Sequence, residues 1–216
     1  MAEKLTLERA IDAFVFELVK LNASWETYIE LFEKSKERFD FVMSNGGIFF
    51  ALVHNAFLDQ IALTLAKFCD PEKSCGKDNL SMDKIIELTK AIGENKIAGE
   101  LHVIAESIKA ACANIKKHRD KRLAHLDFNI FANLSKYELP KIYIKDVNKA
   151  LGELSNFLNK ANMGIGKPSS NIYTPLISGG ANAIIAFLKQ SVRYEQLLQE
   201  HKIDPSDLLQ SGFDDV

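Results

Sequence analysis

The residues best suited to chemistry are Arg119 and His125, six positions apart, with Asp120 directly after the arginine. They lie in the strongly basic run KKHRDKRLAHLD. Residues 116–122 hold five Lys or Arg against one Asp, in a chain whose formal net charge is −2. A local excess of positive charge is typical of surfaces that bind phosphate groups. Because most basic runs are only solvated helix faces, the prediction depends on the arginine and histidine embedded in this one.

These side-chain types suit cleavage of RNA without a metal ion. The reaction needs a base for the ribose 2′-hydroxyl proton, an acid for the leaving 5′-oxygen and fixed positive charge at the phosphorane. Histidine suits the proton transfers because its ordinary pKa of about 6.5 lies near neutral pH. Arginine stays charged and offers forked donors to phosphate oxygens. Asp120 could orient a neighbouring Arg or His, or cap the helix locally.

A helical conformation would bring several of these groups to one side. A six-residue step separates Arg119 and His125 by about 120° around a helix, so the long arginine stem must lean toward the histidine. His118, Arg122 and His125 follow one another at i, i+4 and i+7 and therefore share a face. The segment can present two guanidinium groups and two imidazoles to one cleft. Within this set, His118 is expected to be a flanking surface histidine.

The elements that must position this run are helices. Apolar residues recur at i, i+3 and i+4 from Leu7 to Phe32, which predicts a long first helix with Thr6 as its N-cap. Further helices are predicted over residues 48–68, 81–93, 97 onward, 146–162 and 181–199. No alternation long enough for a sheet is present. We predict an all-α fold, a helical bundle built on long antiparallel helices.

Three details of these helices can be predicted. The helix over 48–68 is apolar on nearly all sides, so we expect it to be the buried central element. It should end near Asp70, because Pro71 disfavours helical geometry in the residue before it. Ser81 is a suitable cap for the next helix. The pattern leaves open whether the helix from residue 97 runs unbroken through Asp127 or starts again near His118.

Composition is that of an ordinary globular protein. The chain has 216 residues, 47% apolar and 26% charged, which suits one domain with or without an appendage. We expect a bundle over residues 1–162, with residues 163–216 forming a loop and a C-terminal helix on the same domain. Three cysteines without a CxxC pair, and no signal peptide, favour the cytoplasm. Polar residues interrupt the most apolar stretch, so no membrane span is expected.

The string R-D-K-R-L-A-H resembles the signature of the HEPN superfamily of all-helical domains. That signature is an Arg, then Asn, Asp or His, then four residues, then His. The longer string R-D-K-R-L-A-H-L-D resembles the abortive-infection (AbiU-like) branch, which is associated with bacterial defence against phage. The layout is also similar, with a long first helix and an apolar helix ending in K-F-C-D-P. The resemblance spans roughly residues 5 to 160.

This resemblance implies a metal-independent endoribonuclease, in phage defence or as a toxin, with a composite site at a homodimer interface. Arg119 would stabilise the phosphorane, His125 would be the acid–base group, and Asp120 would occupy the polar position. No metal or other cofactor is expected, and the expected partners are RNA and an antitoxin or regulatory protein. Some toxin relatives carry a Tyr two residues after the His, where this chain has Asp127. The side chains expected to bind RNA are Lys116, Lys117, Lys121 and Arg122.

Two other interpretations remain open from sequence. The chain could be a catalytically inactive HEPN module that binds RNA or nucleotide, or a dimeric helical scaffold. It could also be a purely structural helical protein whose basic run is a solvated face. Salt-dependent RNA affinity without cleavage would favour the binding module.

Overall fold

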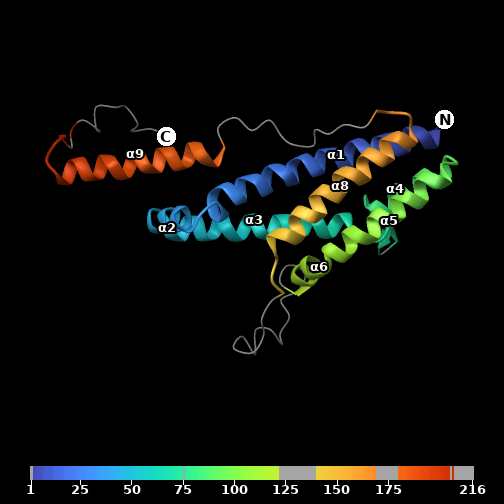
Figure 1. The fold of residues 1–216 in the computed structure, drawn as a ribbon, viewed down its shortest axis with the longest axis horizontal. Helices are drawn as coiled ribbons and strands as arrows, with labels where there is room; N and C mark the ends of the chain where they lie inside the picture. Colours follow the sequence, from blue (N-terminus) through green and yellow to red (C-terminus); the bar gives the residue numbers. More distant parts are fainter. Residues whose placement is uncertain (1, 75, 122–139, 169–179, 205, 207–216) are drawn as a thin grey trace. The chain divides into compact units, whose positions relative to one another are not determined.

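The structure, a computed structural model, describes residues 2–74, 76–121, 140–168, 180–204 and 206. Its elements, labelled in Figure 1, are α1 (Ala2–Tyr28), the π-helical segment η1 (Ile29–Glu33), α2 (Lys36–Ser44), α3 (Gly47–Phe68), α4 (Met82–Ala91), α5 (Asn95–Ala111), α6 (Ala113–Arg119), α8 (Ile144–Gly164) and α9 (Ala181–Gln199). Two short antiparallel strands, β1 (Lys73–Ser74) and β2 (Lys77–Asp78), follow α3. The described residues confirm the all-α prediction.

The chain divides into two compact units. Unit 1 comprises Met1–Trp25 and Asn55–Leu176, and unit 2 comprises Glu26–His54 and Ile177–Val216. The helices α1 and α3 therefore each contribute to both units. The predicted division of the chain near residue 162 stays a prediction.

The core of unit 1 forms around the N-terminal part of α1. The Phe14 ring stacks on Phe68 of α3, with ring centroids 4.1 Å apart, and lies 6.2 Å from Phe157 of α8. Nearer the C-terminal end of α1, the Trp25 indole donates a 2.7 Å hydrogen bond to the Asn148 side chain at the start of α8. Because residues late in α1 meet residues early in α8, the two helices are antiparallel.

The pair α5 and α8 is also antiparallel and lies side by side in Figure 1. The Ser107 hydroxyl donates a 2.9 Å hydrogen bond to Glu153, and Lys160 forms an ion pair with Glu100. The residues that the helical pattern aligned on α8 are all buried: Val147, Leu151, Leu154 and Leu158. Long antiparallel helices are thus confirmed as the framework of unit 1.

The first helix differs from its prediction at its N-terminal end. Its predicted apolar stripe is buried at Leu7, Ile11, Phe14, Leu18, Leu21, Trp25, Tyr28 and Phe32. However, α1 begins at Ala2, so the prediction of Thr6 as its N-cap is wrong. The polar stretch after η1 was not predicted to be helical, yet it forms α2. There the Ser35 hydroxyl accepts a hydrogen bond from the Arg38 amide and caps the helix.

Unit 2 is held by an aromatic and polar cluster. The Tyr28 hydroxyl lies 3.2 Å from Nε2 of His54, and the Phe32 ring meets the His54 ring edge to face. The Arg38 guanidinium donates to the Glu30 carbonyl at 2.8 Å and to the Asn182 side chain of α9 at 3.0 Å. His54 is therefore a hydrogen-bonded packing residue.

The predicted cap of α4 is confirmed and can be tested by stability. Ser81 is fully buried, and its hydroxyl accepts a 3.4 Å hydrogen bond from the Lys84 amide. We expect Ser81→Ala to lower the free energy of unfolding by about 1 kcal/mol, the usual cost of losing a helix cap. Urea denaturation measures this loss. Ser191→Ala, at an exposed position inside α9, serves as the control and should change stability by less than half as much. Equal stability of the two variants would contradict the capping role.

The prediction that the helix over 48–68 is a buried central element is wrong for its first half. Ile48, Phe49 and Leu52 are 84%, 64% and 65% exposed, whereas Ile61 and Leu65 are fully buried. Among the described residues, α3 alone is long and apolar enough to cross a membrane, and 22% of its most apolar 18-residue stretch is buried. One such helix is weak support for a span. The exposed side chains share one face at i, i+1 and i+4.

Candidate functional site

A break between two helices determines where the basic run begins. The helix α5 ends at Ala111, Cys112 forms a turn, and α6 carries the chain to Arg119. The sequence left open whether a new helix starts near His118. In the structure the interruption falls at Cys112, six residues earlier. Cys112 and Cys69 are both buried, and the interaction of their thiols lowers the pKa of Cys69 and raises the pKa of Cys112. This contact joins the start of α6 to the segment that follows α3.

Arg119 is held by two carboxylates. Its Nε–H donates a 2.8 Å hydrogen bond to Asp120. Its Nη1 lies 3.2 and 3.4 Å from the two carboxylate oxygens of Asp70, and its Nη2 lies 3.4 Å from one of them. The arginine side chain is only 17% exposed. Asp120 thus orients the neighbouring arginine, one of the two roles considered from sequence.

The two carboxylates also determine the protonation of Arg119. Burial acts to lower the pKa of the guanidinium, but the hydrogen bonds and negative charge of Asp70, followed by those of Asp120, outweigh burial and raise that pKa. These interactions therefore favour the charged form of Arg119.

Asp70 is the site residue that sequence reasoning missed. It was assigned only as the end of a helix, and it lies 49 residues before Arg119. The one available signal was its place in the string K-F-C-D-P, where Pro71 ends the helix and fixes the backbone next to the carboxylate. In the structure α3 ends at Phe68, which confirms the predicted stop.

The remaining basic residues differ in their environments. Lys116 lies 3.7 Å from Asp70 and its side chain is 39% exposed. Lys117 is exposed, and Lys121 is partly buried. Arg122 and His125 lie outside the described residues, so their predicted roles stay predictions. Asp70, which lies outside the run, adds a negative charge beside Lys116 and Arg119 that the sequence count did not include.

The expectation that His118 is a surface histidine is wrong. His118 is 8% exposed, and its Nδ1 lies 3.0 Å from the carbonyl oxygen of Pro140. It therefore faces the interior of unit 1, where the chain returns toward α8, while Arg119 contacts Asp70. The sequence suggested that the imidazoles of His118 and His125 share one cleft with Arg119. The structure does not support this for His118, because its ring is buried.

The segment after α3 contributes to two hollows in the surface of unit 1. One has a volume of about 550 Å³ and is lined by Glu17, Thr64, Lys67, Phe68, Asp70, Asn79 and Leu80. It shares Asp70 with the arginine site. This hollow and the arginine site are therefore neighbours on the surface of unit 1.

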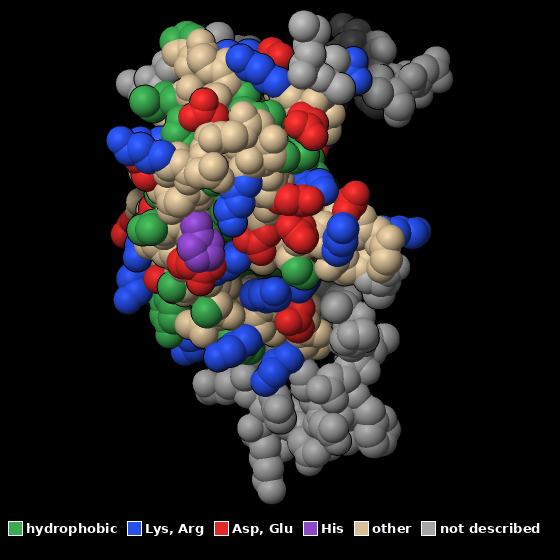
Figure 2. All heavy atoms as spheres, turned by 90° about the vertical axis from the view of Figure 1, so that its right-hand side faces the viewer, with side chains coloured by type: hydrophobic (Ala, Val, Ile, Leu, Met, Phe, Trp, Pro, Cys, Tyr) green, Lys and Arg blue, Asp and Glu red, His purple; other side chains and the backbone are tan. Residues whose placement is uncertain are grey.

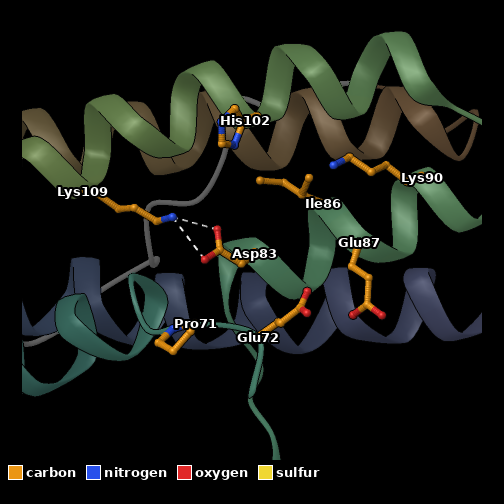
Figure 3. Close-up of a pocket in the computed structure, with 8 residues that line it drawn as sticks. All are labelled: Pro71, Glu72, Asp83, Ile86, Glu87, Lys90, His102 and Lys109. Carbon is orange, nitrogen blue, oxygen red and sulfur yellow. Dashed lines mark hydrogen bonds and ion pairs between the residues drawn. The ribbon is translucent and has the colours of Figure 1, made fainter. Parts of the chain in front are cut away.

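The second hollow has a volume of about 360 Å³ and contains one ion pair between its lining residues (Figure 3). Lys109 of α5 reaches Asp83 of α4 at 2.8 and 3.1 Å, and His102 points from α5 toward Ile86. The face in Figure 2 carries acidic and basic side chains intermixed, without a field of one sign. Within the described ranges, no three His, Cys, Asp or Glu residues gather to hold a metal ion.

Comparison with known families gives one match. The model of the AbiU2 family, a HEPN family, matches residues 4–180, from the first turn of α1 to the residue before α9. The match includes Asp70, Arg119 and the complete R-D-K-R-L-A-H string. No curated protein and no solved structure matches the chain. The chain therefore belongs to the AbiU2 family, an abortive-infection branch of the HEPN superfamily.

Proposed function

We propose that this protein is a metal-independent endoribonuclease that acts in phage defence or as a toxin. The observation that carries the proposal is Arg119: a guanidinium only 17% exposed, fixed by two carboxylates, at the arginine position of the family motif. An oriented, partly exposed guanidinium offers a forked donor that suits a phosphate. The family assignment supports the HEPN type of chemistry.

In the proposed reaction, the 2′-hydroxyl of one ribose attacks the adjacent phosphorus. His125 takes or delivers a proton at an oxygen of this phosphodiester, and Arg119 stabilises the charge on the phosphorane oxygens. The 5′-oxygen leaves with a proton, and the other product ends in a 2′,3′-cyclic phosphate. Lys116, Lys117, Lys121 and Arg122 would bind neighbouring phosphates of the strand.

We also propose that the active form is a homodimer. Its support is the apolar face of α3 formed by Ile48, Phe49 and Leu52, because exposed groups of large apolar side chains commonly mark protein interfaces. A second copy is the simplest partner for such a face, since most soluble oligomers are symmetric homo-oligomers. A cytoplasmic location, no membrane span and an antitoxin or other regulatory partner belong to the same proposal.

A charge on the α3 face should weaken the dimer. We expect Phe49→Glu to raise the dimer dissociation constant at least roughly tenfold, because a buried unpaired carboxylate is strongly unfavourable at an apolar interface. Sedimentation velocity over a concentration series measures this change. Val103→Glu is the matched control, because Val103 is an exposed apolar residue of α5, outside the α3 face. A wild-type chain that stays monomeric throughout the series would contradict the dimer.

The proposed activity is tested with purified protein and single-stranded RNA in the presence of EDTA. The expected result is shortening of the RNA that continues in the chelator and stops when every ribose carries a 2′-O-methyl group. RNA that stays intact at high protein concentration would contradict the proposal.

One observation favours a second function, an inactive module that binds RNA. Within the described residues, Asp70 and Asp120 place two negative charges against the one positive charge of Arg119. Arg119, paired in this way, would hold its own helices together, while Lys116, Lys117, Lys121 and Arg122 would bind RNA. In that case RNA would bind with an affinity that falls steeply with salt, and no products would form.

A further inference from the structure

We propose that Asp70 is a positioning residue of this site, acting on the reaction through Arg119. This inference rests on the proposed ribonuclease function and adds a residue that lies outside the R-D-K-R-L-A-H motif. Its basis is the pair of terminal-nitrogen contacts between Arg119 and the Asp70 carboxylate, at 3.2 to 3.4 Å.

The Asp70 carboxylate stands on a fixed piece of backbone. The Asp70 amide donates a 3.2 Å hydrogen bond to the Lys67 carbonyl, and the Cys69 amide donates a 3.0 Å bond to the Ala66 carbonyl. Cys69 itself is buried, and Pro71 restricts the backbone of Asp70, the residue before it. A carboxylate anchored on both sides can impose its position on a long, otherwise mobile arginine.

The contacts leave part of the guanidinium available. Arginine has five N–H donors. Asp120 engages the Nε–H, and Asp70 engages one N–H on each terminal nitrogen, which accounts for three of the five. The other two N–H groups, one on each terminal nitrogen, would be the donors to a phosphate. Asp70 thus fixes the orientation of the guanidinium without engaging all of its N–H donors.

The same geometry predicts opposite effects on binding and on turnover. Asp70 holds the guanidinium in place, but its negative charge lies close to where a phosphate would bind. Removing the charge while keeping the shape should loosen Arg119 and slow the chemical step. It should also remove a repulsion and strengthen RNA binding. A residue needed only for folding would not produce tighter binding together with slower turnover.

The test compares Asp70→Asn with Asp83→Asn. Asp83 is the matched control because it is a similarly exposed carboxylate of unit 1 that pairs with Lys109, away from Arg119. We expect Asp70→Asn to lower kcat by about 10- to 100-fold, as small misplacements of catalytic groups do. It should lower the Kd for a 2′-O-methyl RNA, which the enzyme cannot cleave, by roughly two- to fivefold. Asp83→Asn should leave both kcat and the Kd for the 2′-O-methyl RNA within about twofold of the wild-type values.

Asp70→Glu keeps the charge but shifts the carboxylate, so it should lower kcat less than Asp70→Asn and leave Kd unchanged. If the Asn variant does not fold, the Glu variant decides alone, and an unchanged kcat would overturn the inference. Folded Asp70→Asn with wild-type kcat, or with weaker RNA binding, would also overturn it while the ribonuclease proposal stands. If wild-type protein binds RNA but never cleaves it, the ribonuclease proposal fails, and the role of Asp70 in turnover fails with it.

Discussion

Replacing His125 by alanine is expected to slow RNA cleavage by about 10²- to 10⁴-fold, the usual contribution of a general acid–base group. The expectation follows from the motif, because His125 stands at the family's histidine position and an imidazole side chain suits proton transfer near neutral pH. Initial rates of oligoribonucleotide cleavage in EDTA measure the effect. RNA affinity should change little, since the contacts to phosphates are assigned to Lys and Arg side chains.

His102→Ala provides the control for this experiment. His102 is an exposed histidine of α5, placed against α4 beside Ile86 rather than against Arg119 (Figure 3). Its removal should leave the rate unchanged. Cleavage by His125→Ala at the wild-type rate would reject the assignment of the acid–base group.

Replacing Arg119 by alanine is expected to reduce kcat by about 10²- to 10³-fold, the loss found when one preorganised donor to a developing oxyanion is removed. Arg119→Lys should give an intermediate rate, because it keeps the charge but loses the fork that matches the phosphate and Asp70. Arg193→Ala, at an exposed position of α9, is the control and should be fully active.

Loss of Arg119 also affects the folded state, so stability must be measured beside the rate. Without the guanidinium, the partly buried Asp70 keeps only Lys116 at 3.7 Å among its described ion-pair partners. A modest fall in Tm is therefore expected in the alanine variant. A folded Arg119→Ala protein that cleaves RNA at the wild-type rate would remove Arg119 from the mechanism.

Much of the helical framework could be predicted because it depends on local periodicity. The stripe on α1, the aligned leucines of α8, the cap at Ser81 and the bounds of α9 all follow from residues close together in sequence. The first half of α3 could not be predicted, because an apolar side chain looks the same in sequence whether a core or a partner covers it. Only the fold distinguishes buried Ile61 from exposed Ile48.

The candidate site was predictable only in part, because some of its contacts join residues that are far apart in sequence. Arg119 and Asp120 are neighbours, so their hydrogen bond could be anticipated from spacing. Asp70 reaches Arg119 across 49 positions, and no local pattern connects the two. His118 was expected at the surface because it has no counterpart in the family signature. Its burial depends on the Pro140 carbonyl, which a distant return of the chain brings to it.

The most direct test of the account is the chemical identity of the RNA ends left by wild-type protein in EDTA, determined by mass spectrometry. Attack by the 2′-hydroxyl, promoted by Arg119 and His125, predicts a 2′,3′-cyclic phosphate on one fragment and a 5′-hydroxyl on the other. Fragments ending in a 3′-hydroxyl and a 5′-phosphate, or cleavage directly after a 2′-deoxy nucleotide, would contradict it.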